Sequence, residues 1–330
     1  MVARRYGGPL EKKPMTKLRI GTRGSELALW QANHVAGELR VRGHEIEIEI
    51  IKTTGDKFAE AAFPQVGAFS GTTKGIFTKE IEEALSEGRV HLAVHSLKDL
   101  PTELPSGFSL AAILKREDAR DALVSKSLNS LGELPAGARV GTSSLRREAQ
   151  LRALRPDVEV RPLRGNVGTR LGKLERGEFD AIVLASAGLR RLGREADAMH
   201  LFDYDEMCPA AGQGALAIEV REGDAGTHEA VKFLNDSATR TATECERALL
   251  AALGGGCQVP IGAYAQVSGG KSRLIAKVGR RDGSEMLVER GEGDDPKKLG
   301  AMVAQKLIQR GAAEILREIY GTPVAIPQQP

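Results

Sequence analysis

Residues 17–53 read KLRIGTRGSELALWQANHVAGELRVRGHEIEIEIIKT and combine three patterns. A short strand pattern at 17–22 turns into a helix that Ser25 caps and Gly43 ends. The following residues, 44–53, alternate between apolar and polar side chains, which is typical of a strand. A strand, a helix and a second strand in this order predict a parallel sheet of the doubly wound α/β type.

The alternation of short strands and helices continues along the chain. RIGTR at 19–23 is echoed by RVGTS at 139–143, each time where a strand enters a helix. Two α/β domains of similar build explain this echo. Further strands are expected at 90–94, 108–114, 121–125, 157–163, 179–186 and 214–220, and helices at 79–88, 144–155 and from Asn166 onward.

The C-terminal part follows a different pattern. A helix at 239–256 ends in three glycines, and two or three strands follow, with a hairpin turn at Arg281-Asp282-Gly283. One long helix is expected at 296–319. The sequence therefore predicts a small α+β domain after the two α/β domains. Residues 1–16 are expected to form a mobile extension, and 321–330 a tail.

The composition excludes several classes of protein. The 330 residues carry a net charge of only +3, which is too small for a surface that binds nucleic acid through its positive charge. Aromatic residues make up only 4%, too few for a surface on which bases stack. No apolar run reaches the roughly 18 residues of a membrane helix. The N-terminus also lacks the apolar core of a secretory signal. We therefore expect a cytoplasmic protein with neither a nucleic-acid nor a membrane partner.

Cysteines and histidines give no metal signature. The three cysteines form no C-x-x-C pair, so neither a disulfide framework nor a zinc site is expected. His91 and His95 lie four residues apart on an expected strand, a separation of about 13 Å that is too long for one ion. We expect no metal.

Arginines gather in the turns between strands and helices. A cation at a helix N-terminus opposes the helix dipole at a cost of about 0.3–1 kcal/mol, so the fold gains from it only when an anion binds there. In doubly wound folds these turns lie at the ligand-binding edge of the sheet. A solvated basic face is the alternative, but clusters at three equivalent turns favour a polyanionic small molecule. The clusters are Arg23, Arg146 with Arg147, and Arg164 with Arg170.

HSLKDLP, residues 95–101, is a polar turn that directly follows an apolar strand and ends in a proline. Asp99, beside Lys98, is a candidate catalytic carboxylate that its neighbours keep ionised. An ordinary turn aspartate before a proline is the alternative. The spacing of the residues does not decide between the two.

GGGCQVP, residues 254–260, follows a helix with more glycines than a helix C-cap needs. Cys257 on this open backbone is a candidate covalent attachment point or nucleophile. A small buried residue at the start of a strand is the alternative, and it is the interpretation given to Cys208 and Cys245.

Seven stretches together resemble the porphobilinogen deaminase (hydroxymethylbilane synthase) family. The resemblance runs in order from about residue 17 to 320. The stretches are RIGTRGSELALWQ (19–31), KGIFTKE (74–80), HSLKDLP (95–101), GTSSLRR (141–147), LRGNVGTR (163–170), PAAGQG (209–214) and GGCQVPIG (255–262).

The resemblance implies an enzyme of tetrapyrrole biosynthesis. Such an enzyme condenses four porphobilinogens head to tail into linear hydroxymethylbilane and releases ammonia, on a dipyrromethane cofactor joined by a thioether to Cys257. The implied fold has two domains like type II periplasmic binding proteins and a small α+β domain that carries the cysteine. The implied bounds are 17–114 plus 214–233, then 115–213, and then 234–320. A monomer without an obligate protein partner is expected.

The resemblance also assigns roles to residues. Asp99 is expected to pair with pyrrole N–H groups, to stabilise the cation of an azafulvene intermediate and to move protons. The residues expected to hold the cofactor's carboxylates are Ser96, Lys98, Ser144, Arg146 and Arg147. Those expected to face the substrate are Arg23, Ser25, Lys74, Phe77, Arg164, Arg170 and Arg191, with Phe77 covering a ring face.

One segment of the sequence departs from the family pattern, and two other classes of protein are alternatives. The loop 60–73 lacks the Gly-Gly pair and the nearby lysine usual before Lys74, so its role as an active-site lid is open. A binding protein of the type II periplasmic kind would explain two α/β domains and the arginines. It would need neither Cys257 nor a third domain, and it would normally carry a signal peptide. A nucleic-acid-binding protein fits less well, because of the charge and the few aromatic residues.

Overall fold

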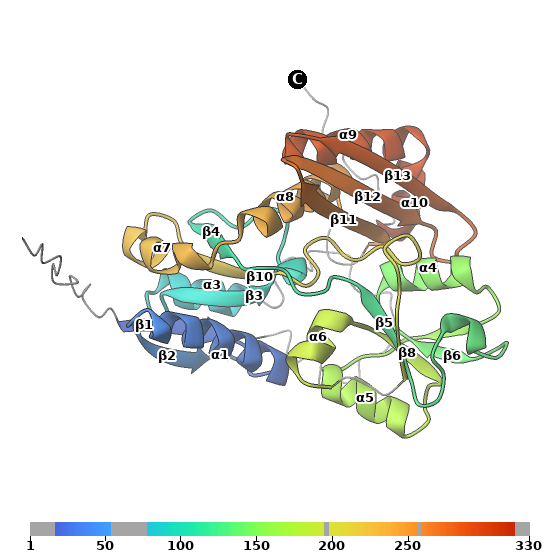
Figure 1. Cartoon of the computed structure of the whole chain (residues 1–330), viewed down its shortest axis with the longest axis horizontal. Helices are drawn as coiled ribbons and strands as arrows, with labels where there is room; N and C mark the ends of the chain where they lie inside the picture. The colour runs from blue at the N-terminus through green and yellow to red at the C-terminus, as the bar shows by residue number, and fades with distance from the viewer. Residues whose placement is uncertain (1–16, 54–77, 195–197, 256–258, 321–330) are drawn as a thin grey trace, which may run out of the picture.

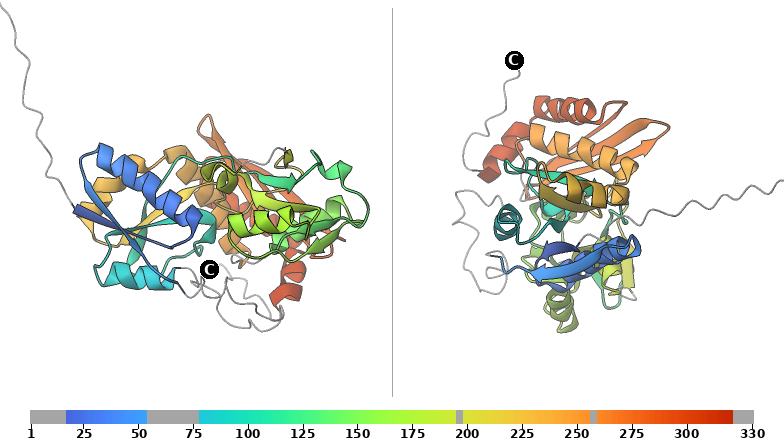
Figure 2. Two further views of the ribbon diagram at one scale, coloured as in Figure 1. Left: turned by 90° about the horizontal axis from the view of Figure 1, so that it is seen from below. Right: turned by 90° about the vertical axis from the view of Figure 1, so that its left-hand side faces the viewer.

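The computed structural model describes residues 17–53, 78–194, 198–255 and 259–320. Within these ranges lie two five-stranded sheets and one three-stranded sheet. The first sheet is built mostly from the N-terminal part of the chain, the second from the middle and the third from the C-terminal part (Figure 1). The third sheet and its helices lie over the junction of the first two sheets (Figures 1 and 2).

The first sheet has the strand order β2-β1-β3-β10-β4. β1 is parallel to β2 and β3, whereas β10 is antiparallel to both of its neighbours. The buried side chains of α1, among them Val35 and Leu39, pack on one face of this sheet, and those of α3 on the other. The elements are β1 (Lys17–Thr22), α1 (Glu26–Val41), β2 (Glu45–Ile50), α3 (Lys79–Ser86), β3 (Leu92–Ser96), β4 (Phe108–Ile113), β10 (Leu216–Arg221) and α7 (Ala225–Val231).

The second sheet repeats this plan with the order β7-β6-β8-β5-β9. β6 is parallel to β7 and β8, and β5 is antiparallel to β8 and β9. β6 therefore takes the place of β1, which confirms that the sequence echo reflects two domains of similar build. The elements are β5 (Asp121–Ser125), β6 (Arg139–Gly141), α4 (Leu145–Leu154), β7 (Glu159–Arg161), α5 (Val167–Glu175), β8 (Ala181–Ala185), α6 (Ser186–Arg191) and β9 (Ala198–Leu201).

The two five-stranded sheets are of the expected α/β type, but each also contains one antiparallel strand, which the sequence pattern did not predict. The chain usually reaches a parallel strand through a connecting helix. β5 and β10 are entered instead by links that cross between the two sheets, residues 114–120 and 202–215. We call these two links the crossovers. β10, from late in the chain, thus lies between β3 and β4 of the first sheet. The residue bounds of the domains stay a prediction.

The C-terminal part forms the expected small α+β domain. Its antiparallel sheet, β11-β12-β13, shares a core with α8 and α9 through side chains such as Leu249, Val303 and Leu307. Gly283, with φ +78, occupies the expected hairpin turn. The elements are α8 (Ser237–Ala252), β11 (Ile261–Ser268), β12 (Lys271–Gly279), β13 (Met286–Gly293), α9 (Pro296–Gln309) and α10 (Ala312–Tyr320).

The prediction of one long helix at 296–319 is wrong, because the structure has two helices there. Gly311 has φ +103, a conformation outside the helical region, and it separates α9 from α10. The other expected strands and helices are present within a few residues of their predicted ends. β9, α6 and α7 were not predicted.

Candidate functional site

The strand-to-helix turns form as the sequence predicts. Ser25 caps α1 by accepting a hydrogen bond from Ala28 N at 3.3 Å. Ser144 caps α4 and accepts from Arg147 N at 3.4 Å, and Asn166 caps α5. Side-chain oxygens thus satisfy helix N–H groups that would otherwise lack partners.

Arg146 and Arg147, in the first turn of α4, are buried and form ion pairs with a carboxylate that was not predicted from the sequence. Asp121, the fully buried first residue of β5, accepts from Arg146 Nη1 at 2.6 Å and from Arg147 Nη2 at 2.7 Å. Burial alone raises the pKa of Asp121, but the two guanidinium groups outweigh it and hold that pKa well below its usual range. The protein itself therefore supplies an anion, Asp121, for these two arginines at the N-terminus of α4.

Gln213, on the second crossover, connects this ion cluster to the turn after β3. Its Nε2 donates to Asp121 Oδ1 at 2.9 Å and to Ala119 O at 2.7 Å. Its Oε1 accepts from Lys98 Nζ at 3.3 Å. One hydrogen-bonded network therefore joins the two α/β sheets.

Lys98 and Asp99 lie together on the short 3-10 helix η1 (Leu97–Asp99). Loss of hydration lowers the pKa of Lys98 to about 8, although the negative charge of Asp99 opposes the shift. Arg170, on α5, has its pKa lowered to about 10 by burial and then by the charge of Arg147, again opposed by Asp99. Asp99 of the first sheet is thus within electrostatic reach of Arg170 of the second.

The structure therefore brings five of the expected site residues to one place between the two sheets. We call this group, together with Asp121, the site cluster. It holds four cationic side chains and two carboxylates, which leaves an excess of two positive charges. Its members are Lys98, Asp99, Asp121, Arg146, Arg147 and Arg170.

Other expected residues lie around the site cluster. Ser96 Oγ accepts from Gln31 Nε2 at 2.8 Å. Arg191 Nη2 donates to Gly214 O at 2.6 Å, and its guanidinium lies 5.9 Å from the ring centre of Trp30. Burial lowers the pKa of Arg191 to about 10. Arg23 is half-buried in the turn after β1, and Arg164 is exposed before α5.

Lys74, Phe77, Cys257 and the loop 60–73 lie outside the described residues. Cys208 and Cys245 are both buried, and burial raises the pKa of each thiol to about 12. A thiol with so high a pKa is almost entirely protonated near neutral pH and is a poor nucleophile. The burial expected of these two cysteines is confirmed.

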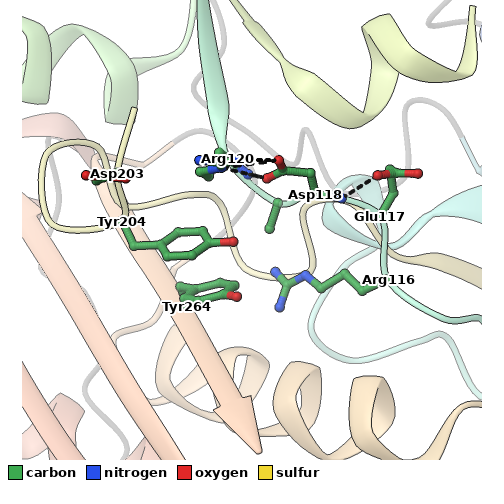
Figure 3. A pocket seen from close by; sticks show the side chains of 8 residues that line it. Arg116, Glu117, Asp118, Arg120, Asp203, Tyr204 and Tyr264 are labelled. Carbon is green, nitrogen blue, oxygen red and sulfur yellow. Dashed lines mark hydrogen bonds and ion pairs between the residues drawn. The ribbon is translucent and has the colours of Figure 1, made fainter. Parts of the chain in front are cut away.

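A hollow of about 320 Å³ lies beside the first crossover (Figure 3). The rings of Tyr204 and Tyr264 stack in it at a centroid distance of 3.7 Å. Arg116 is paired with Glu246, and Arg120 with Asp118. Because both arginines are already neutralised from within the protein, this hollow is a weaker candidate for an anion site than the site cluster.

Comparison with protein families decides the identity of the fold. Residues 18–229 match the sequence model described as "Porphobilinogen deaminase, dipyromethane cofactor binding domain". Residues 241–309 match that of the porphobilinogen deaminase C-terminal domain. The chain belongs to the porphobilinogen deaminase family. The first match ends within α7 and the second begins within α8, on either side of residue 234, where the sequence predicts that the third domain begins.

Individual members of the family are similar over nearly their whole length. A porphobilinogen deaminase from Thiobacillus denitrificans is 49% identical over 306 residues, which cover 92% of this chain and 98% of that protein. One from Chromobacterium violaceum is 48% identical over 313 residues, covering 94% of this chain and 100% of that protein.

Solved structures of binding proteins are similar at a lower level. An ancestral cationic amino acid solute-binding protein is 15% identical, with a TM-score of 0.41 over 66% of this chain and 87% of that chain. A probable amino-acid transporter binding protein from Bacillus subtilis is 10% identical, with a TM-score of 0.40 over 67% and 91% of the two chains.

The site cluster fits the cofactor named by the family. Dipyrromethane, as two linked porphobilinogen rings, carries an acetate and a propionate on each ring. The cluster has an excess of positive charge, and the buried Nε of Arg146 has no hydrogen-bond partner among the described residues. A buried donor without a partner is costly, and a carboxylate is the acceptor that guanidinium groups bind best.

Proposed function

We propose that the site cluster is where this chain performs the reaction of its family. The chain is a hydroxymethylbilane synthase, which condenses porphobilinogen molecules head to tail into linear hydroxymethylbilane and releases ammonia. The observation that supports the placement is the network from Asp121 through Gln213 to Lys98, which connects the turn that carries Asp99 to the second sheet. The cations around it suit a substrate with two carboxylates on every ring.

The cofactor is dipyrromethane, which supplies, when bound, the primer to which the substrate rings are added. Its proposed attachment point is Cys257. Arg146 and Arg147 share one internal carboxylate between two guanidinium groups, so they retain positive charge for a second anion. Lys98 has a neutral partner in Gln213 and contributes a further charge. The residues proposed to hold the cofactor's carboxylates are Ser96, Lys98, Ser144, Arg146 and Arg147.

The substrate side of the site is proposed at the turns that face this cluster. Arg170 is half-buried beside Asp99 and Arg147, which suits it to receive a carboxylate next to the reacting ring. Arg164 is exposed at the start of the same helix, where an incoming anion meets it first. The residues proposed to bind substrate are Arg23, Ser25, Lys74, Phe77, Arg164, Arg170 and Arg191.

Asp99 is proposed as the catalytic residue. Positive charge develops on the substrate ring as ammonia leaves, and a fixed carboxylate stabilises it. The same carboxylate is placed to accept a hydrogen bond from a pyrrole N–H and to take a proton from the new linkage. Asp121, the other carboxylate of the site cluster, is already paired with Arg146 and Arg147, so it cannot replace Asp99, and the loss of Asp99 is expected to be severe.

Substitution of Asp99 tests this role. Asp99→Ala is expected to lower turnover by about 10²–10⁴-fold, the range that acid–base and electrostatic groups supply. Asp99→Glu keeps the charge but moves it, and a smaller loss is expected. Glu103→Ala, at an exposed position four residues further on, is the control and should keep wild-type turnover. Near-normal product formation by cofactor-loaded Asp99→Ala protein would remove Asp99 from the mechanism.

We further propose that the protein is a cytoplasmic monomer. None of the helices in the described part of the chain is long and apolar enough to cross a membrane. The site cluster is assembled entirely from side chains of one chain, so the proposed site needs no second copy. Sedimentation equilibrium should give the mass of one chain, and a dimer at assay concentrations would contradict the proposal.

A further inference from the structure

Arg247 reaches from α8, in the C-terminal domain, to the segment that follows Asp99. Its Nη2 donates to Pro101 O at 2.6 Å and to Thr102 O at 2.9 Å, and its Nη1 lies 3.5 Å from Leu100 O. One planar guanidinium group therefore binds three consecutive carbonyl oxygens. A planar fork of donors is pre-organised for such a task, whereas a lysine ammonium is not.

The backbone on the other side of Asp99 is also fixed. Leu97 N donates to Ala215 O at 3.0 Å, at the end of the second crossover, and the Leu97 side chain is fully buried. Leu100 is buried as well, and its N–H donates to Leu97 O. Pro101 has no N–H to anchor the chain, so after Leu100 the segment depends on its carbonyl groups. Arg247 is the side chain that binds them.

The helix that carries Arg247 is itself held firmly. The adjacent Glu246 is fully buried and accepts from Arg116 Nη1 at 2.6 Å, from Gly212 N at 2.7 Å and from Ala265 N at 2.8 Å. Arg116 and Gly212 belong to the two crossovers, and Ala265 to β11. α8 is thus attached to both links between the α/β sheets, which makes Arg247 a fixed arm.

We propose that Arg247 is a positioning residue for Asp99. By binding the carbonyl groups of Leu100, Pro101 and Thr102, it holds the backbone that sets where the Asp99 carboxylate lies. α8 also leads to residues 254–260, where the proposed cofactor attachment point is. The C-terminal part of the chain would therefore position the catalytic carboxylate, and it also contains the proposed attachment point in its sequence. This inference rests on the role proposed above for Asp99.

Substitution of Arg247 in the cofactor-loaded enzyme tests the proposal. Arg247→Gln is expected to lower kcat and kcat/KM together by about 10–100-fold, because a displacement of about 1 Å costs that much at a reacting centre. Arg247→Lys should recover part of the loss, since an ammonium group still donates to carbonyl oxygens. Arg281→Gln is the matched control. Arg281 also joins the C-terminal domain to an α/β domain, through Glu148 at 3.0 Å, and neither residue belongs to the site cluster. Its turnover should be that of wild type.

A double variant separates positioning from a merely structural effect. If Arg247 acts through Asp99, then Arg247→Gln should slow Asp99→Ala enzyme hardly at all, because the two losses are not additive. Wild-type turnover by loaded Arg247→Gln, or a loss that multiplies with that of Asp99→Ala, would overturn the inference. If Arg247→Gln does not fold, the same cycle is run with Arg247→Lys. Full activity of Asp99→Ala alone would instead contradict the proposed function.

Discussion

Asp121 offers the clearest test of how the site cluster is held together. This fully buried carboxylate accepts from Arg146 Nη1, from Arg147 Nε and Nη2, and from Gln213 Nε2, at 2.6 to 3.1 Å. Asp121→Asn keeps the shape of the side chain but removes its charge. Two buried guanidinium groups then lose their anion, and breaking a buried ion pair from one side costs about 3–5 kcal/mol.

The cost can be read as a change in melting temperature. With about 2.1 cal/mol/K of unfolding entropy per residue, 1 kcal/mol shifts the Tm of a 330-residue chain by about 1.4 °C, so Asp121→Asn should lower Tm by about 4–7 °C. Asp180→Asn is the control beside the same sheet. Asp180 directly precedes β8 and pairs with Arg139, and both side chains are about one-third exposed, at 38% and 33%. An exposed pair contributes at most about 1 kcal/mol, so the shift in Tm expected there is at most about 1–2 °C.

Scanning calorimetry of both variants in a Cys257→Ser background measures the two shifts without a contribution from bound cofactor. Because the folded-state pKa of Asp121 is held below its unfolded value, its stabilisation is present above about pH 4 and is lost as the pH falls below that. The difference in Tm between wild type and Asp121→Asn should thus stay constant from pH 5 to 8 and shrink at lower pH. Equal shifts for the two variants would refute the reasoning.

Two further predictions concern Lys98 and the C-terminal hairpin. Lys98 has a folded-state pKa of about 8 against an unfolded value of 10.5, so its burial costs stability below pH 8 and this cost fades as the pH rises. In the Cys257→Ser background, Lys98→Met should melt higher than its parent at pH 7, and this advantage should shrink above pH 8 and be nearly gone by about pH 11. A gap independent of pH would contradict the burial of a charged Lys98. Gly283 has φ +78, and an added Cβ would lie 2.5 Å from Ala153 N of α4, whereas Gly269, with φ +59, has nothing within 4 Å. Gly283→Ala should therefore lower Tm clearly more than Gly269→Ala, and equal shifts would show that the hairpin does not dock tightly on α4.

The local elements could be predicted because their signals are local. Ser25, Ser144 and Asn166 stand at the positions where side-chain oxygens cap helices, and each does so in the structure. The repeated strand-to-helix turn also predicted two domains of the same build. Such signals need only a few neighbouring residues, and tertiary packing does not reverse them here.

The antiparallel strands and the ion cluster could not be derived from local pattern. Whether β10 runs parallel or antiparallel depends on where the chain enters the sheet, and periodicity carries no information about that. An acidic residue, Asp121, begins an apolar strand, and that position could have indicated a buried charge. Its partners, however, lie 25 and 26 residues away along the chain. Gln213 and Arg247 act over 115 and about 146 residues, through contacts that only the fold creates.

The break in the expected helix at 296–319 is marked in the sequence by Gly311, but the apolar spacing around it favoured a continuous helix. Gly311 lies inside a stretch whose apolar spacing continues on both sides, and a single glycine is tolerated within many helices at about 1 kcal/mol. The positive φ that it adopts is a property of the folded backbone.

The central claim is that the site cluster serves a covalent dipyrromethane on Cys257. Its most direct test is the intact mass of protein made with a supply of porphobilinogen, compared with the Cys257→Ser variant. The wild-type mass should exceed the sequence mass by two linked pyrrole units, the excess should map to Cys257, and it should vanish in the variant. A wild-type protein without the adduct, or an adduct on Cys208 or Cys245, would contradict the account.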